Sequence, residues 1–227
     1  MASSARPNLP NGFLGAQPKF SEIKLKTDSH PNAEFKVIAE NNVVIKIKTG
    51  VPIKVVTKLV QCPNDKELNN YVLIQRKDKD SVRFHVAFPE NGWYKFQIFA
   101  LEENSATESL PNVYNYLIQV DHSFKPGQPY VKAYTKFYQD FCLLEEPLYL
   151  NASKRNLDKA QFKMIVPGAY KVAVHCGEEW FHLEKKGDFW EGKADLLKYS
   201  GKNSKVTVNG NYEKDGNSYS VLLEYTI

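Results

Sequence analysis

Cysteine is scarce in this chain of 227 residues, which carries only Cys62, Cys142 and Cys176. They form no Cys-x-x-Cys pair, and an odd, sparse set does not make a disulfide framework. The sequence therefore gives no zinc or thiol-redox motif. We expect three free thiols that pack as small apolar side chains. A bridge between Cys142 and Cys176 stays open as the alternative for an extracellular chain.

Long hydrophobic runs are also missing. No stretch approaches the roughly 18–20 apolar residues that cross a membrane as a helix. The first ten residues include Arg6, Pro7 and Pro10 and have no apolar run of the kind a secretory signal needs. We therefore expect no membrane span and a cytoplasmic location.

Neither sign of charge dominates. The chain has 30 Lys and Arg against 26 Asp and Glu, a formal net charge of +4. Dedicated nucleic-acid binders usually concentrate basic residues in a stripe that raises the net charge much further. We therefore expect no nucleic-acid partner.

Residue types that perform catalysis are present but lack catalytic spacing. The five histidines show neither His-x-His nor His-Glu-x-x-His spacing, and no glycine-rich loop leads into a helix. Paired glutamates such as Glu178-Glu179 sit at turns or strand ends, where charge is normally solvated. His175 and Cys176 are adjacent, so on a strand they face opposite sides, although His182 approaching a cysteine across strands stays open. We expect no enzyme activity, no catalytic residue, no metal and no cofactor.

The sequence does contain a strong alternation of apolar and polar residues, which predicts half-buried strands. In the first half the runs centre on residues 43–47, 53–59, 82–88, 94–100 and 114–120, and about seven strands are counted from Phe20. In the second half they centre on residues 162–166, 170–176, 180–184, 189–194, 205–208 and 219–225. Turn residues separate the runs, a pattern typical of β-sandwiches. The one helix that we predict covers residues 135–144.

This pattern predicts an all-β protein with two sandwich domains in tandem. Residues 1–18 are rich in Pro, Asn, Ser and Gly and are expected to form a flexible leader or a strap on the first domain. The first sandwich is expected over residues 19–122 and the second over residues 131–227. Residues 123–130 contain Pro126, Gly127 and Pro129 and are expected to link them.

Aromatic residues are abundant, with 13 Tyr, 13 Phe and 3 Trp. Most lie on the alternating faces and are expected in the cores. Trp180 and Trp190 stand near turns, and we take both as candidate contact-surface residues, with core packing and a sugar-binding platform as alternatives. Gly92-Trp93-Tyr94 resembles a tyrosine corner, in which the ring hydroxyl bonds a backbone group nearby.

Several longer motifs occur in a characteristic order. In the first half they are Asn11-Gly12-Phe13-Leu14-Gly15, Phe88-Pro89-Glu90-Asn91-Gly92-Trp93-Tyr94 and Leu110-Pro111-Asn112-Val113-Tyr114-Asn115-Tyr116-Leu117-Ile118. In the second half they are Cys142-Leu143-Leu144-Glu145-Glu146-Pro147, Val166 to Val174, Gly177 to Leu183, Trp190-Glu191-Gly192 and Ser218 to Tyr225.

Together these motifs resemble the C-terminal region of kyphoscoliosis-peptidase and hillarin-type proteins, from about residue 8 to residue 227. The resemblance implies two tandem immunoglobulin-like modules. Such proteins carry a transglutaminase-like catalytic domain upstream, and this chain begins where that domain would have ended, so no catalytic residue is carried over. Because relatives are associated with the cytoskeleton, the resemblance also implies binding or scaffolding.

The expected function is therefore a non-enzymatic protein-binding or scaffold module, associated with the cytoskeleton. It would act through exposed sheet faces, sheet edges and the junction between the domains. Two alternatives stay open: a lectin-like module that binds carbohydrate, and a structural protein that self-associates through strand edges into a filament or matrix.

Overall fold

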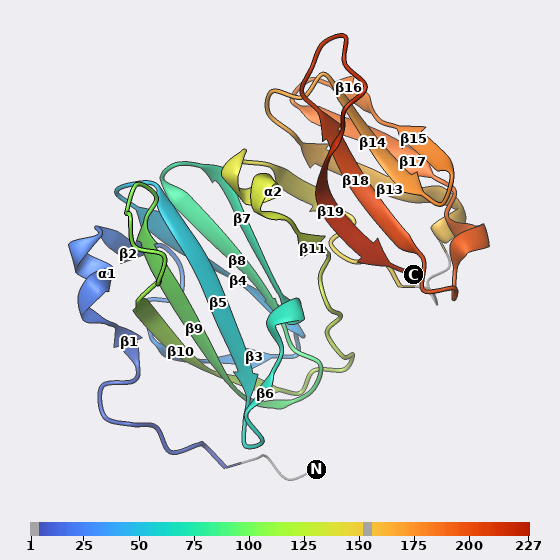
Figure 1. Cartoon of the computed structure of the whole chain (residues 1–227). Coiled ribbons are helices and arrows are strands. Elements are labelled where there is room, and N and C mark those ends of the chain that lie inside the picture. The colour runs from blue at the N-terminus through green and yellow to red at the C-terminus, as the bar shows by residue number, and fades with distance from the viewer. Residues whose placement is uncertain (1–4, 152–155) are drawn as a thin grey trace. The chain divides into compact units, whose positions relative to one another are not determined.

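The computed structural model describes residues 5–151 and 156–227, and the side chain of Lys77 is also left undescribed. The chain divides into two compact units. Unit 1 comprises Met1–Ile74 and Asp78–Pro129, and unit 2 comprises Gln75–Lys77 and Tyr130–Ile227. Figure 1 shows that both units are built from strands, with only a few short helices between them. The all-β prediction is confirmed.

Unit 1 contains two sheets. The larger has the strand order β1-β10-β9-β5-β6, with β3 also pairing β10 in parallel. Its strands are β1 (Gly15–Ala16), β3 (Glu34–Ile38), β5 (Ile53–Gln61), β6 (Lys66–Glu67), β9 (Gly92–Glu102) and β10 (Asn112–Asp121). The smaller has the order β2-β4-β8-β7. Its strands are β2 (Leu25–Thr27), β4 (Asn42–Thr49), β7 (Val72–Asp78) and β8 (Ser81–Ala87), and Gln75–Lys77 of β7 are grouped with unit 2.

The core of unit 1 lies between these two sheets. Alternate residues of β8 and β9 point inward, and Phe84 of β8 meets Phe96 of β9 edge to face with ring centroids 5.8 Å apart. Both rings are fully buried. Helix α1 (Pro18–Glu22) adds Phe20 to the core, and the short helix η1 (Asn69–Tyr71) precedes β7. Two sheets with a shared apolar interior make a β-sandwich.

Tyr94 forms the predicted tyrosine corner. Its hydroxyl donates a hydrogen bond of 2.6 Å to the carbonyl oxygen of Glu90, and its ring is fully buried against Phe88. The bond ties the turn before β9 to the strand itself, which fixes where the strand begins.

The described part of the leader lies on unit 1. Leu9 and Leu14 pack against the buried cluster of Cys62, Trp93 and Leu117. Arg6 pairs with Glu34, β1 pairs with β10, and residues 1–4 lie outside the described residues. Near the C-terminal end of the unit's sequence, the Gly127 N–H donates to the carbonyl of Phe88, and an added Cβ at Gly127 would stand 2.6 Å from that oxygen. Only glycine allows the chain to pass so close.

Unit 2 also has two sheets. The five-stranded sheet has the order β11-β19-β18-β14-β15 and the four-stranded sheet the order β12-β13-β17-β16. The first consists of β11 (Lys132–Ala133), β14 (Lys171–Cys176), β15 (Glu179–His182), β18 (Lys205–Asn211) and β19 (Ser220–Thr226). The second consists of β12 (Leu143–Glu146), β13 (Ala160–Ile165), β16 (Glu184–Lys186) and β17 (Phe189–Ala194).

Phe162 of β13 meets Tyr225 of β19 edge to face at 6.0 Å, so these two sheets also enclose a core. The unit has three short helices among its described residues: α2 (Thr135–Gln139), η2 (Leu157–Lys159) and η3 (Leu197–Tyr199). The predicted two-sandwich architecture is therefore confirmed.

Two local predictions differ from the structure. The helix expected over residues 135–144 ends at Gln139, because the apolar run from Leu143 continues as β12 and pairs with β13. Phe20, taken as the start of the strand series, lies in α1, where Pro18 occupies a first-turn position. Proline is favoured there because its missing N–H has no partner in the first turn of a helix.

Candidate interaction surface

Three aromatic side chains gather on the outer face of the five-stranded sheet of unit 2. Val174 and Cys176 of β14 point into the core, so His175 between them points outward. Trp180 of β15 is the residue directly paired with His175. Because paired residues on antiparallel strands point to the same side, both rings stand on the outer face.

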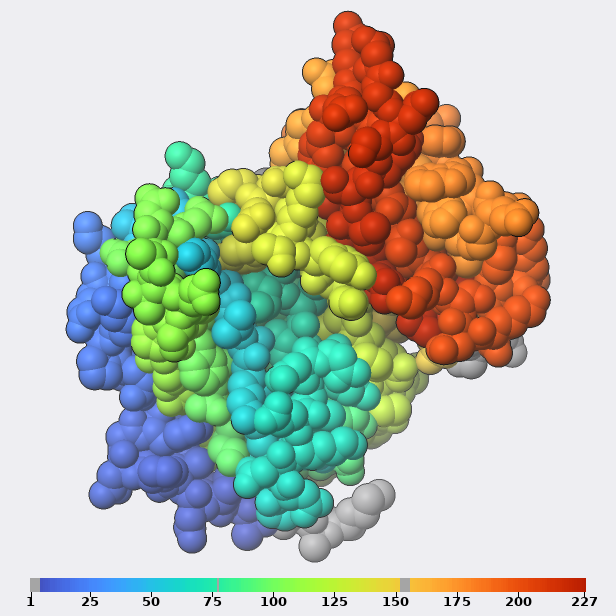
Figure 2. Space-filling view, viewed as in Figure 1, coloured from blue at the N-terminus to red at the C-terminus, as the bar shows by residue number. Residues whose placement is uncertain are grey.

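The aromatic cluster of His175, Trp180 and Tyr219 is continuous. The ring centroids of His175 and Trp180 are 4.4 Å apart and those of Trp180 and Tyr219 are 5.0 Å apart. Tyr219 comes from the loop between β18 and β19, which projects beyond the sheet in Figure 1 and forms the red protrusion of Figure 2. Trp180 keeps 44% of its surface exposed although it contacts both neighbours. An indole held by two rings yet open to solvent is preorganised for contact.

A polar network lies on another part of the same sheet. The Tyr134 hydroxyl donates a hydrogen bond of 2.9 Å to Glu224 of β19, and Lys205 lies 3.5 Å from that carboxylate. These contacts, the Tyr134 hydrogen bond above all, lower the pKa of Glu224. Protein interfaces enrich aromatic residues at their centre and keep polar residues at their rim, so Trp180 fits the centre of such a surface and the Glu224 network fits its rim.

Trp190 does not belong to this surface, and its assignment as a contact residue is corrected. It is 6% exposed and pairs across β13 and β17 with Met164, which is fully buried. Trp190 therefore occupies an inward-facing position of β17. Its indole Nε1 has no hydrogen-bond partner among the described residues, and Lys185 lies over its ring at 5.7 Å.

The three cysteines are free and buried, as expected. Burial raises the pKa of Cys62 and Cys176, and it raises that of Cys142 to about 12. Only the thiolate is a nucleophile, so each of these thiols is held in its unreactive form. The side chains that act on the pKa of Cys142 and Cys176, besides burial, do not include His182, which lies two residues from Trp180 on the same side of β15.

Native thiol labelling tests this arrangement. At neutral pH we expect iodoacetamide to label the folded chain at least about a hundredfold more slowly than the chain in urea, because the native thiols are shielded and protonated. The rates are measured by mass spectrometry of each cysteine peptide. Rapid labelling of one cysteine in the folded protein would show an activated thiol and contradict this result.

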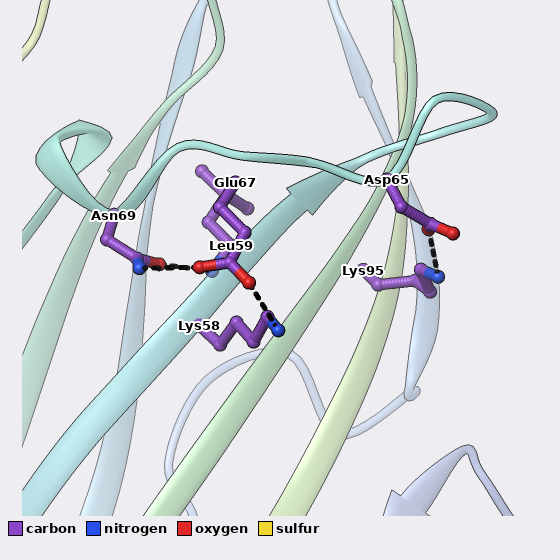
Figure 3. Close-up of polar contacts among 6 residues, drawn as sticks. All are labelled: Lys58, Leu59, Asp65, Glu67, Asn69 and Lys95. Atoms are coloured by element: carbon purple, nitrogen blue, oxygen red, sulfur yellow. Dashed lines mark hydrogen bonds and ion pairs between the residues drawn. The ribbon is translucent and has the colours of Figure 1, made fainter.

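The charged residues around the β5–β6 hairpin form ion pairs instead of a catalytic site. Lys95 lies 2.6 Å from the carboxylate of Asp65, and Glu67 contacts both Lys58 and Asn69 (Figure 3). The Lys58 contact lowers the pKa of Glu67 and the Lys95 contact lowers that of Asp65, so both carboxylates are kept ionised. Exposed pairs of this kind contribute little to stability and hold a hairpin in place.

No group of metal-ligating side chains occurs among residues 5–151 and 156–227. Of the glutamates weighed as catalytic carboxylates, Glu179 accepts from Lys198 at 2.8 Å and from the Tyr199 hydroxyl at 3.0 Å. These contacts lower its pKa, which is opposite to the shift that a general acid needs.

A buried polar cluster of unit 2 escaped the sequence analysis. Arg76 is 2% exposed, and its guanidinium lies 4.2 Å from the ring centroids of both Tyr138 and Phe141. Its Nε donates to the carbonyl of Tyr138 at 3.0 Å. The neighbouring Gln75 exchanges two hydrogen bonds with the backbone of Leu144. Sequence reasoning missed this cluster because its members lie more than 60 positions apart.

Solved structures resemble this chain weakly. One match is to a chain from the crystal structure of Dpr2 Ig1-Ig2 in complex with DIP-Theta Ig1-Ig3. The alignment covers 88% of this chain and 96% of that chain, at 10% identity and a TM-score of 0.28. For the class 5 fimbriae chaperone CfaA the coverages are 88% and 98%, at 14% identity and a TM-score of 0.28. For the Ig1 domain of mouse SynCAM 2 they are 40% and 90%, at 11% identity and a TM-score of 0.23. Similarity at this level carries no functional argument.

The match to a sequence family is decisive. No curated protein matches the chain. In contrast, residues 9–131 match the family described as "KY-like, immunoglobulin-like domain". The matched segment is more than half of the chain and contains all strands of the first sandwich. The chain therefore belongs to the KY-like, immunoglobulin-like domain family.

Proposed function

We propose that the chain is a protein-binding module that contacts its partner through the aromatic cluster of His175, Trp180 and Tyr219. The observation that carries the proposal is the 44% exposure of Trp180 within a continuous row of rings in contact. Tryptophan is the residue type most enriched among interface hot spots. Val221 of β19, 38% exposed, adds an apolar side chain to the same sheet.

The proposal includes a non-enzymatic role. Buried, protonated thiols and a Glu179 carboxyl with a lowered pKa support it, because neither is prepared for nucleophilic or general acid catalysis. Free thiols also fit the proposed cytoplasmic location. The resemblance to kyphoscoliosis-peptidase and hillarin-type proteins supports a scaffold role on the cytoskeleton.

Substituting Trp180 tests the proposal. We expect Trp180→Ala to reduce recovery of a specific set of proteins from a native extract by about 30-fold, the effect of losing a hot-spot contact of about 2 kcal/mol. Tyr170→Ala is the matched control, because Tyr170 is an aromatic residue, 55% exposed, that precedes β14 at the end away from His175. Quantitative mass spectrometry compares the two variants with the wild type.

Equal recovery by the wild type and Trp180→Ala would reject this surface as the binding site. A glycan array run in parallel tests the lectin-like alternative. If the wild type binds a sugar and Trp180→Ala does not, the ligand of this surface is a carbohydrate and not a protein. Thermal unfolding of each variant checks that the substitution leaves the sandwich folded.

A further inference from the structure

The outer face of the smaller sheet of unit 1 carries a block of positive charge. In β4 the side chains of Ile45 and Ile47 are buried and point inward. Because side-chain direction alternates along a strand, Lys46 and Lys48 point outward. By the same alternation Arg83 of β8 and Lys26 of β2 point outward. The basic block of Lys26, Lys46, Lys48 and Arg83 therefore lies on three neighbouring strands.

The strand register places like charges opposite each other. Lys46 pairs directly with Arg83, and Lys26 pairs directly with Lys48. Side chains at such positions start from Cβ atoms about 5 Å apart, and like charges there destabilise a sheet. Within the described residues, the block has one ion pair, which joins Lys48 to Asp28 at 3.0 Å. Four cations and one carboxylate leave a local charge of 4 − 1 = +3.

The electrostatics of a neighbouring residue agree with this arrangement. His85 follows Arg83 on the same face of β8, opposite Val44. Burial, and then the charge of Arg83, lower its pKa to about 4. His85 is therefore neutral at physiological pH and adds no further repulsion to the block.

We propose that this basic block binds an acidic, extended segment of a protein partner, at a second site distinct from the aromatic cluster. Along a strand, side chains two residues apart on one face are separated by about 6.8 Å. Lys46 and Lys48 have that spacing, and so do alternate glutamates of an extended peptide lying along β4. A bound acidic segment would replace repulsion between paired cations by attraction to carboxylates, which explains why the sheet carries these pairs.

Features of the same face distinguish this occupant from two others. Single-stranded nucleic acid sites combine basic grooves with aromatic side chains on which bases stack. The outward positions of β8 include Arg83 and His85 but no phenylalanine, tyrosine or tryptophan, since Phe84 is fully buried on the opposite face. Peripheral membrane binding usually adds apolar residues that enter the lipid, whereas the outward positions of β4 beside the lysines are Asn42 and the half-buried Val44.

A labelled peptide tests the proposal with the full chain. The probe is a fluorescein-labelled peptide of eight glutamates, the length of β4, and its neutral counterpart has eight glutamines. We expect the wild type to bind the glutamate peptide at least about tenfold more tightly at low ionic strength, and to lose this preference as added salt shortens the Debye length below about 10 Å. Fluorescence anisotropy measures both affinities.

Two double variants assign the site. We expect Lys46→Gln/Arg83→Gln to bind the glutamate peptide about tenfold more weakly, as two ion pairs are lost. Its melting temperature should equal or exceed that of the wild type, because the repulsion between residues 46 and 83 is removed. Lys159→Gln/Lys193→Gln removes the same charge from exposed positions of unit 2 and should change the affinity less than twofold, within the scatter of about 0.4 kcal/mol typical of remote surface changes.

Equal affinity for the two peptides, or equal losses in the two double variants, would overturn the proposal. Tighter binding to phosphatidylserine vesicles or to oligothymidylate, lost in Lys46→Gln/Arg83→Gln, would also overturn it by assigning the block to a membrane or a nucleic acid. Neither double variant changes Trp180. If the basic block does not bind the glutamate peptide, the proposed function of the aromatic cluster can still be tested by itself.

Discussion

Replacing Phe96 by alanine is expected to lower the free energy of unfolding of unit 1 by about 3–5 kcal/mol. Phe96 is fully buried on β9, edge to face with Phe84 and stacked at 6.4 Å on Tyr116 of β10. Removing the ring takes away its buried apolar area and leaves a cavity. The cavity lies between Tyr116 of β10 in the same sheet and Phe84 of β8 in the opposite sheet, and both sheets would have to move to close it. The rigid backbone of paired strands allows only partial closure.

Urea unfolding, monitored by hydrogen-exchange mass spectrometry, measures this loss in the free energy of unfolding, because the amides of β9 report on unit 1 directly. Phe96→Leu keeps most of the apolar volume and should cost less than about half as much. Gln97→Ala, on the next residue and the opposite face, creates no core cavity and removes only a long hydrogen bond of 3.4 Å to Asn115, so it should cost less than about 1 kcal/mol. A loss below about 1 kcal/mol for Phe96→Ala would show that this ring is not central to the core.

Local alternation was sufficient to predict much of this fold. The run from Phe189 to Ala194 forms β17 with the predicted bounds, and Gly92-Trp93-Tyr94 begins a strand with the predicted tyrosine corner. These features depend on residues close in sequence, whose side-chain direction follows from a period of two. The parallel pairing of β3 with β10 was not predicted, because it joins residues about 80 positions apart.

The candidate surfaces show why strand prediction alone does not locate a site. Trp180 and Trp190 both lie on short strands near turns, yet the first points outward beside His175 and the second lies opposite Met164 in the core. Sequence alternation identifies which residues share a face, but pairing with other strands decides which face is buried. The pairing of Lys46 with Arg83 likewise depends on strand register. The basic block therefore could not be predicted from the sequence, whose net charge is only +4.

The tyrosine corner provides the second stability prediction. Tyr94→Phe is expected to lower the free energy of unfolding by about 1–2 kcal/mol. The ring stays in place, so no cavity forms, but the carbonyl of Glu90 loses the donor that it holds at 2.6 Å. Urea unfolding at neutral pH measures the loss, and Tyr170→Phe, at a residue 55% exposed, is the control that should change little. Equal stabilities of wild type and Tyr94→Phe would mean that the corner does not hold the start of β9.

The pH dependence of the same pair of proteins tests whether the Tyr94 hydroxyl is buried in the folded state. Burial raises the pKa of Tyr94 above its ordinary value near 10. The unfolded chain therefore releases the phenolic proton at a lower pH than the folded chain does, and the unfolded state binds fewer protons once the pH exceeds about 10. Stability contributed by Tyr94 is fully present below that pH and falls as the pH rises further. Phenylalanine cannot ionise, so the advantage of the wild type over Tyr94→Phe should shrink between about pH 9 and pH 11, whereas a purely steric effect of the substitution would stay constant across that range.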